Sequence, residues 1–356
     1  MREIALANCT LAICALTGLA ACGPREAPTS TSSLFAFRVD NPALIELDAG
    51  LQVKHEIPIA LPSGCGLGGA FPAPRGPWLV IELSCNFGQA VLLLNADTAE
   101  MSQPVASSDS HFLAWSPTGD AIFLKLASMN APRIVLQRLD GKQEVLPISE
   151  LTYDIAPAPK GDAFVFSFSQ GMGLGSEMWS AGKSGAHPRR IASDASHYLS
   201  LARWSADGSQ IAFIKIPDSS TPFTVGELWV MQADGSQRRR LALADAGHGF
   251  APAWSPDGTR IAFVARENPE DPAGDTSSAA LRSNIHVVSV ASGEEVTLTR
   301  FDSARVEGPA WQPNGEAIAF GAIADDRMTV FLMDLISGQM NRIPIDSICC
   351  AGWLNR

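Results

Sequence analysis

The sequence predicts an all-β protein, a single β-propeller of seven four-stranded blades, with a six-bladed ring as the alternative. Three observations support this fold class. A ten-residue motif that opens with Trp-Ser-Pro recurs along the chain. A hairpin turn such as Asp-Gly follows most copies at a similar distance. After the first 22 residues, no long apolar stripe has the 3.6-residue period of a helix, so helices should be few.

The repeated motif sets the length of each unit. Its copies begin at Pro72, Trp115, Pro157, Trp204, Trp254, Trp311 and Trp353. The copies that open with proline keep only the turn proline and glycine. Successive copies begin 42 to 57 residues apart, enough for four short antiparallel strands and typical of propeller blades. The tryptophans that open the copies are expected in the core between blades.

Two neighbouring units show how each is expected to fold. Ser255-Pro256-Asp257-Gly258 has the residues of a type I turn, and the apolar run 261–264 predicts a second strand after it. In the preceding unit, 227–231 and 239–241 predict the third and fourth strands, joined by a hairpin at Asp234-Gly235.

The two ends of the sequence are expected to share the seventh blade. Segments 34–39, 43–47 and 53–59 predict strands two, three and four of a unit that lacks a first strand. Residues 350–353 predict a first strand with nothing after it. Joined, they form a clasp of one C-terminal strand with three N-terminal strands, which closes the ring and leaves no unpaired edge. The propeller domain is therefore predicted to span 34–356.

The repeats at 204–241 and 254–293 resemble those of the TolB-type propeller family, with Trp-Ser-Pro-Asp-Gly followed by Leu-Trp-Val-Met and Ala-Asp-Gly. The likeness covers about 290 residues and is weak at 34–82 and 153–193. TolB itself has six blades and a separate N-terminal α/β domain, which this sequence does not show. The resemblance therefore implies a TolB-like propeller, and TolB's partners do not transfer wholesale.

The first residues read as a targeting signal. Arg2 is followed by an apolar stretch from Ile4 to Leu19, which predicts a signal peptide over 1–21. Leu19-Ala20-Ala21-Cys22 resembles the lipobox of bacterial lipoproteins, in which Cys22 would be acylated, and 22–33 is expected to be a flexible tether. Gly23 replaces the aspartate of inner-membrane lipoproteins, which favours the outer membrane, facing the periplasm. The alternative is a secreted protein cleaved after an alanine.

The charge balance excludes one class of partner. The formal net charge is −11, whereas nucleic-acid binding needs a basic surface. We expect membrane contact through the lipid anchor only, and a monomeric propeller.

The candidate binding face is the one that carries the long loops 169–176, 217–226 and 267–283. Tyr198 and Phe223 are candidate anchors for a partner there. Connections between the fourth strand of one blade and the first strand of the next are expected to bring further side chains to the mouth of the channel on this face. These residues are His111, Tyr153, His197, His248, Arg305 and Glu307.

The histidines His111, His197 and His248 could bind a divalent metal together with a carboxylate such as Asp109 or Glu307. The sequence has no closely spaced pair of ligands, so unconnected loop histidines are the favoured interpretation. No metal or cofactor is expected.

Four cysteines remain after Cys22, namely Cys65, Cys85, Cys349 and Cys350. All four are expected on the same rim of two neighbouring blades. Disulfides suit an oxidising compartment, and a pairing across the clasp would hold the C-terminal strand. Three connectivities are open. A four-cysteine zinc site and a vicinal Cys349–Cys350 redox pair are the alternatives.

Motifs for catalysis are weak. Gly64–Gly69 matches the dinucleotide pattern Gly-x-Gly-x-x-Gly, but the prolines after it cannot open the helix that this chemistry needs. No Gly-x-Ser-x-Gly sequence occurs. The sequence therefore favours a non-catalytic, lipid-anchored propeller of the bacterial cell envelope that binds a protein or peptidoglycan-associated partner. The alternative is a metal-dependent lyase or hydrolase, since oligogalacturonate lyases are propellers with similar repeats and a histidine-rich metal site.

Overall fold

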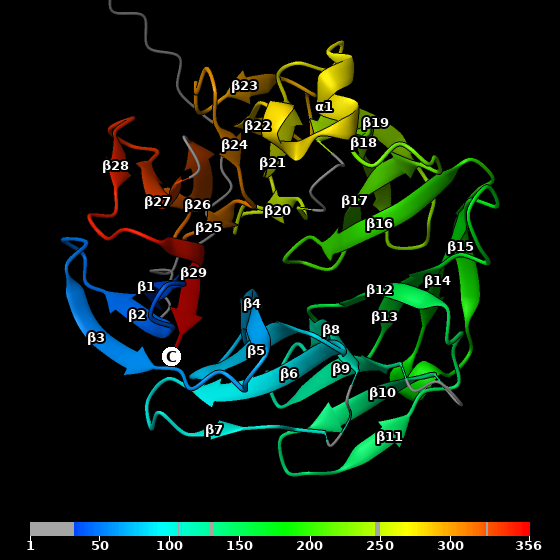
Figure 1. Ribbon diagram of the computed structural model, residues 1–356. Coiled ribbons are helices and arrows are strands. Elements are labelled where there is room, and N and C mark those ends of the chain that lie inside the picture. The colour runs from blue at the N-terminus through cyan, green and yellow to red at the C-terminus, as the bar shows by residue number, and fades with distance from the viewer. Residues whose placement is uncertain (1–31, 106, 108, 128–131, 246–249, 325–326) are drawn as a thin grey trace, which may run out of the picture. The chain divides into compact units, whose positions relative to one another are not determined.

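The computed structural model describes residues 32–105, 107, 109–127, 132–245, 250–324 and 327–356. In this part the chain forms seven antiparallel sheets, and Figure 1 shows them as the blades of a ring. The predicted seven-bladed propeller is confirmed, and the six-bladed alternative is wrong. We call the sheets blades A to G and count the strands of each blade from the centre of the ring outwards.

The first four blades contain the following strands. Blade A has β29 (Ile348–Asn355), β1 (Ser32–Arg38), β2 (Ala43–Leu47) and β3 (Val53–Pro58). Blade B has β4 (Cys65–Pro72), β5 (Trp78–Cys85), β6 (Gly88–Asn95) and β7 (Met101–Ser102). Blade C has β8 (Ser110–Trp115), β9 (Ala121–Leu126), β10 (Arg133–Arg138) and β11 (Gln143–Val145). Blade D has β12 (Thr152–Pro157), β13 (Phe164–Phe168), β14 (Ser176–Ala181) and β15 (Arg189–Asp194).

The remaining three blades follow the same plan. Blade E has β16 (His197–Trp204), β17 (Gln210–Pro217), β18 (Val225–Gln232) and β19 (Arg239–Asp245). Blade F has β20 (Ala253–Trp254), β21 (Arg260–Arg266), β22 (Ser283–Ser289) and β23 (Glu295–Thr297). Blade G has a first strand in two pieces, β24 (Arg305–Val306) and β25 (Ala310–Trp311), then β26 (Ala317–Ala324), β27 (Arg327–Asp334) and β28 (Met340–Arg342).

Helices are short. The structure has α1 (Pro272–Thr276) and the 3₁₀ turns η1 (Lys183–Gly185) and η2 (Ser278–Ala280). Among the described residues, no helix is both long and apolar enough to cross a membrane.

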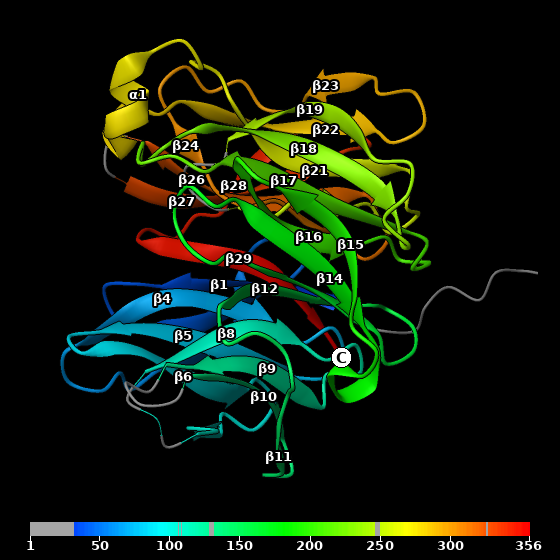
Figure 2. The same cartoon turned by 90° about the vertical axis from the view of Figure 1, so that its right-hand side faces the viewer.

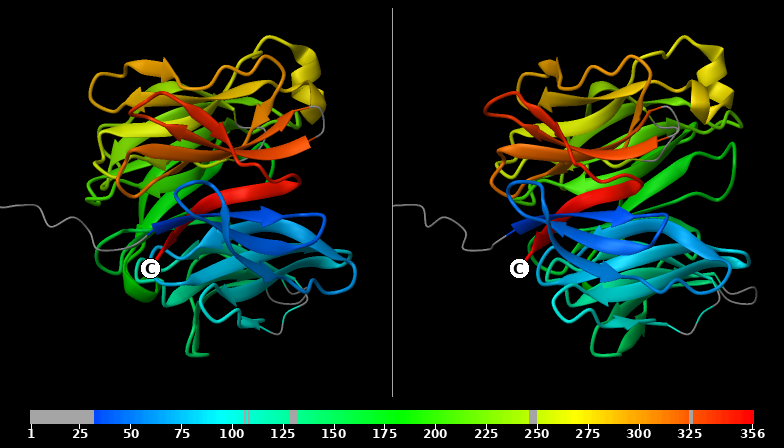
Figure 3. Two further views of the ribbon diagram at one scale, coloured as in Figure 1. Left: turned by 90° about the vertical axis from the view of Figure 1, so that its left-hand side faces the viewer. Right: turned by 60° about the vertical axis from the view of Figure 1, so that its left-hand side comes forward.

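The clasp closes the ring as expected. β29 pairs with β1 in antiparallel register, with Trp353 opposite Leu34, and Figure 3 shows the red β29 beside the blue β1. β1 begins at Ser32, two residues before the predicted strand. The buried side chains of Phe35 and Phe37 pack against Cys349 in the core that blade A shares with blade B.

The repeated motif forms the turn between the first and second strands. In blade F the amide of Gly258 donates to the Ser255 carbonyl at 2.8 Å, and Gly258 has a φ of 70°, a conformation that favours glycine. The hydroxyl of Ser255 also accepts the amide of Arg260 at 2.9 Å. These bonds place the buried strand segment after Arg260 against the rest of the sheet.

The motif tryptophans join neighbouring blades. Each indole N–H donates to a carbonyl of the preceding blade, at the residue just before the start of that blade's own motif. The donor–acceptor pairs, at 2.8 to 3.1 Å, are Trp115–Phe71, Trp204–Ala156, Trp254–Arg203, Trp311–Ala253 and Trp353–Ala310. The same indoles fill space between the sheets, so the motif fixes both the turn and the contact between blades.

Candidate functional site

One face of the ring carries the connections between second and third strands, together with those from a fourth strand to the next first strand. In the side view of Figure 2, α1 lies at this end, on the left, and the residues after β29, marked C, lie at the other end. The three predicted loops connect the second and third strands of blades D, E and F.

A hydrogen bond joins the loops of blades D and E. The amide of Gly175, just before β14, donates to a carboxylate oxygen of Asp218 at 2.8 Å. Hydrogen bonds from the backbone, with that of Gly173 the strongest, lower the pKa of Asp218 below its ordinary value. The carboxylate is therefore charged at neutral pH and holds the end of the blade D loop against blade E.

The loops of blades E and F are joined by a buried arginine. Arg266 ends β21, and its side chain is completely buried. Its guanidinium donates to the Phe223 carbonyl at 3.1 Å and to the Asp275 carboxylate at 2.9 Å. It also donates to the backbone carbonyls of Asp271 and Asn268. One side chain thus donates to backbone acceptors of two loops and joins them.

Local geometry keeps the blade F loop compact around this arginine. Asp271 caps α1 by accepting the amide of Ala273 at 3.0 Å. Gly274 packs so closely that a Cβ there would lie 2.5 Å from a guanidinium nitrogen of Arg266. The amide of Phe223 donates back to the Asp275 carbonyl at 3.2 Å. The two loops therefore form one hydrogen-bonded unit.

Blade G is attached to the same unit. Arg305 of β24 donates to the Ser278 carbonyl of the blade F loop at 2.9 Å. Blades D, E, F and G are thus connected through their loops on this face. We call the linked segments 169–175, 218–224 and 267–282 the linked loops.

The loop-rich face also exposes large apolar side chains. Met172 is 72% exposed and Leu174 is 62% exposed, both in the blade D loop. Phe87, in the corresponding turn of blade B, is 91% exposed. Apolar groups on a rigid, polar-rimmed surface are typical of protein-binding sites.

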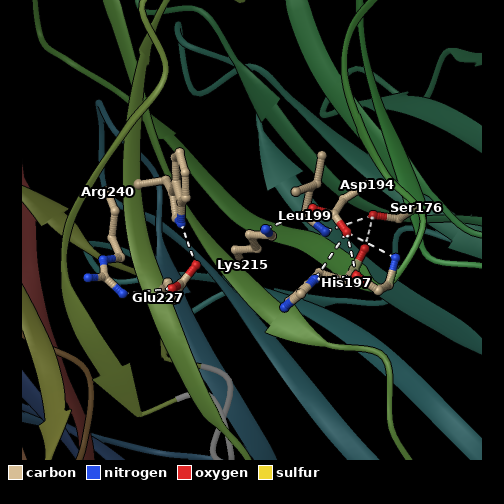
Figure 4. Close-up of polar contacts among 9 residues, drawn as sticks. Ser176, Asp194, His197, Leu199, Lys215, Glu227 and Arg240 are labelled. Atoms are coloured by element: carbon tan, nitrogen blue, oxygen red, sulfur yellow. Dashed lines mark hydrogen bonds and ion pairs between the residues drawn. The ribbon is translucent and has the colours of Figure 1, made fainter.

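A polar cluster lies where blade D meets blade E (Figure 4). Asp194 ends β15, and its carboxylate accepts Lys215 Nζ at 2.8 Å and the Ser196 amide at 2.9 Å. Nδ1 of His197, the first residue of β16, lies 3.0 Å from Oδ1 of Asp194. Burial raises the pKa of Asp194, but the hydrogen bonds from Lys215, Ser196 and His197 outweigh it and leave the pKa well below its ordinary value. The charged carboxylate fixes the imidazole.

The serine near this pair has a structural role. The hydroxyl of Ser176 donates to the His197 carbonyl at 3.2 Å and accepts the Leu199 amide at 2.7 Å. These bonds engage the hydroxyl with the backbone of β16, so it does not form the nucleophile–imidazole contact of a hydrolytic triad.

His111 has its own acidic partner. Its Nε2 lies 3.1 Å from Oδ1 of Asp109, the carboxylate that also accepts the Gln89 amide at 3.0 Å. The carboxyl of Glu82 is nearby and accepts the Phe112 amide at 3.1 Å. Burial raises the pKa of Glu82. Each of the two described candidate histidines is therefore paired with a separate aspartate.

The tyrosines of this region also join blades D and E. Tyr153 donates from its hydroxyl to the Leu199 carbonyl at 2.9 Å, and burial raises its pKa above the ordinary value. Its ring lies edge-on to that of Tyr198, with 5.9 Å between centroids. Tyr153 thus stays a neutral hydrogen-bond donor that holds β16 in place.

The candidate residues lie at the starts of first strands rather than in the connecting loops where the sequence placed them. His111, Tyr153, His197 and Arg305 belong to β8, β12, β16 and β24. A register shift follows the histidine in blades C and E and falls at Tyr153 itself in blade D, so the first strand contains an irregularity that the motif does not reveal. His248 lies outside the described residues.

Glu307 lies near the cysteines of the clasp. Its amide donates to the Gly321 carbonyl at 2.8 Å, and a Cβ on Gly321 would lie 2.7 Å from a Glu307 carboxylate oxygen. The hydrogen bond with Cys350, burial and the charge of Glu307 all raise the pKa of Cys349. Cys349 is therefore a protonated thiol at neutral pH, which makes it a weak nucleophile.

The four cysteines lie in or against one core cluster shared by blades A and B. Cys65 and Cys85 are directly opposite in the β4–β5 pair and form a disulfide. Cys349 and Cys350 are thiols. Because Cys65 and Cys85 face each other within one hairpin of blade B, they do not pair with Cys349 or Cys350 across the clasp. With Cys65 and Cys85 joined in a disulfide, the four cysteines do not form a set of four free thiols for a zinc ion.

Within the described residues, no group of three or more histidine, cysteine, aspartate or glutamate side chains is placed to hold a metal ion. The sequence patterns did not indicate Asp194, Lys215 or Arg266. A charged residue after the apolar run of a second strand, as at Lys215 and Arg266, is the signal that could have indicated the last two.

Comparison with known proteins places the fold but not the activity. No family model matches the chain, and no curated protein matches it. Among solved structures, an oligogalacturonate lyase in complex with manganese is 12% identical, covers 88% of this chain and 85% of its own, and has a TM-score of 0.58. Hydrazine synthase from Kuenenia stuttgartiensis is 16% identical over 78% of this chain and 80% of its own, with a TM-score of 0.57.

TolB from Acinetobacter baumannii is also similar, at 20% identity over 83% of this chain and 68% of its own, with a TM-score of 0.49. The likeness to solved structures concerns the fold alone. Their different names show that this fold serves unrelated functions, so function must be argued from the face described above.

Proposed function

We propose that this chain is a non-catalytic propeller of the bacterial cell envelope, anchored by lipid at Cys22, that binds a protein or peptidoglycan-associated partner through its loop-rich face. The observation that carries the proposal is the connection of the linked loops through Asp218 and the buried Arg266. Loops that are already ordered lose little conformational entropy on binding. The TolB-type repeats and the signal pattern at 1–22 support an envelope location, and Gly23 after Cys22 favours the outer membrane.

Recognition would centre on the exposed apolar side chains. Met172 and Leu174 stand on the blade D loop, which Asp218 holds from the neighbouring blade. A few apolar anchors within a polar rim carry most of the affinity in protein interfaces. Rigid display by the ring, with attachment at Cys22, is the proposed mechanism.

Cross-linking of the purified protein to a solubilised envelope fraction tests this proposal. The double substitution Met172→Asp and Leu174→Asp should remove cross-linked partners seen with the wild type. Ile336→Asp is the matched control, since Ile336 is 77% exposed but lies in a hairpin at the opposite end of the strands. Partners retained by the double variant, or lost equally in the control, would count against the loop-rich face.

The lipid anchor has a separate test. Metabolic labelling with a fatty-acid analogue should mark the wild-type protein, and the label should be absent from Cys22→Ser. Equal labelling of both proteins would overturn this part of the proposal without affecting the binding face.

The alternative, a metal-dependent lyase or hydrolase that uses the histidines of the mouth, has less support. His111 and His197 are each held by their own aspartate. We expect elemental analysis of the purified protein to find no stoichiometric metal. A stoichiometric metal that is lost when His111 and His248 are both replaced by alanine would favour the alternative instead.

A further inference from the structure

Two of the seven junctions between blades lack the indole that joins the others. Blades B and D open their motif with Pro72 and Pro157 in place of tryptophan. At the junction of blades A and B, Arg356 pairs with Glu46 of blade A and with Asp97 of blade B. At the junction of blades C and D there is instead a cavity of about 550 Å³.

Two residues that line this cavity differ from their counterparts at the junction of blades F and G. Pro157 lines it where a motif tryptophan would stand. Ala121, six residues after the motif start of blade C, also lines the cavity. The corresponding residue of blade F is Arg260. There the guanidinium of Arg260 lies over the ring of Trp311, 5.0 Å from its centroid. Blades C and D therefore have neither member of that stacked pair, and the buried Phe123 of blade C stands at the position of Ala262 in blade F.

The cavity has an aromatic floor and a charged rim. Phe123 and Phe164 contribute buried rings with 5.4 Å between centroids. Around them stand exposed ion pairs, Arg138 with Asp120 at 3.4 Å and Lys183 with Asp162 at 3.8 Å. An apolar centre with a polar rim is the arrangement of a binding hot spot.

We propose that this cavity binds a tryptophan side chain presented by a partner polypeptide, in place of the indole that the repeat lacks there. The Ala114 carbonyl, just before the motif of blade C, corresponds to the Ala253 carbonyl that accepts Trp311. The ion pairs of the rim supply partners for the peptide backbone beside the tryptophan.

The occupant must come from another molecule. All eight tryptophans of the chain belong to described strands. The cavity is lined by turns and hairpins at the end of the strands opposite the linked loops. It is therefore a second site, independent of the proposed binding face.

Titration with N-acetyl-L-tryptophanamide, followed by protein NMR, tests the proposal. We expect saturable binding with a dissociation constant of about 1 mM, and binding at least tenfold weaker for N-acetyl-L-leucinamide. No saturation by the tryptophan probe, or equal binding of both probes, would overturn it.

Filling the cavity from within is the second part of the test. Pro157→Trp restores the residue of the repeat and should abolish probe binding while leaving the ring folded. If that variant does not fold, Ala121→Arg, which copies Arg260, should weaken binding at least tenfold. A folded filling variant that binds the probe as the wild type does would show that the probe binds elsewhere, and the proposal would fall.

Discussion

Arg356 and Glu46 are 310 residues apart in the sequence and form a two-bonded ion pair in the structure. The guanidinium donates to the two carboxylate oxygens at 2.7 and 2.9 Å. Glu46 lies in β2 and is only 4% exposed. Arg356 directly follows β29, so the pair joins the first strand of blade A to its third. It reinforces the clasp by a second route beside the β29–β1 ladder.

This pair should make the clasp sensitive to acid. The hydrogen bond from Arg356 is the main cause that lowers the pKa of Glu46 from 4.5 to about 2. Because the folded-state pKa is depressed, the stabilisation is complete above about pH 5 and is lost as the pH falls toward 2. It amounts to about 3 kcal/mol at pH 7. Urea unfolding should show Glu46→Gln to be less stable than the wild type at pH 7. The difference between their free energies of unfolding should be smaller by about 2 kcal/mol at pH 3.

The control for this prediction is Glu56→Gln in the same blade. Glu56 pairs with Arg38 at 2.6 Å but is 36% exposed, so its loss should change stability by less than about 1 kcal/mol. If the difference in unfolding free energy between the wild type and Glu46→Gln stays constant from pH 7 to pH 3, the role assigned to the Glu46 carboxylate is contradicted.

The disulfide should stabilise blade B. Cys65 and Cys85 are 20 residues apart in sequence, and closing a loop of this length contributes about 3 kcal/mol. Replacing both with serine, or adding a reductant, should lower the free energy of unfolding by a similar amount. Cys350→Ser should keep the response to reductant. An oxidised wild type no more stable than the reduced protein would contradict the prediction.

Arg266 should control the order of the linked loops. Arg266→Ala removes the donor that joins the Phe223 carbonyl of one loop to the Asp271 carbonyl and the Asp275 carboxylate of the other. We expect the amides of Phe223 and Gly274 to exchange hydrogen at least tenfold faster and the ring to lose about 3 kcal/mol of stability. Arg282→Ala, in the same loop but exposed, is the matched control. Unchanged exchange in Arg266→Ala would show that other contacts hold the loops.

The motif tryptophans should contribute to stability through their indole nitrogen. Trp311→Phe keeps an aromatic ring but loses the hydrogen bond to the Ala253 carbonyl and weakens the contact with Arg260. Thermal unfolding should show a loss of about 2 kcal/mol. Trp179→Phe should cost less, since Trp179 donates to Glu177 of its own strand. Equal losses of stability in Trp311→Phe and Trp179→Phe would contradict the role assigned to the hydrogen bond between blades.

The fold could be predicted because its determinants are local. The turn at Ser255–Gly258, the apolar strand after it and the hairpin at Asp234-Gly235 lie within one repeat. Counting the copies, and joining the incomplete unit at each end, determined seven blades and the clasp. The face that carries the long loops followed from the same order of strands.

Tertiary structure alone decided which distant residues meet. Sequence analysis grouped His111 and His197 at one mouth, whereas the structure gives each its own aspartate, Asp109 and Asp194.

The disulfide, the Arg266 contacts and the Glu46–Arg356 pair depend on the register of strands and on the packing of blades. The cavity between blades C and D is lined by Pro157 and Ala121, which belong to different repeats. A repeat sequence specifies strands because their hydrogen-bonding and apolar patterns are short-ranged. Side-chain contacts between blades depend on how the closed ring positions residues that the sequence keeps far apart.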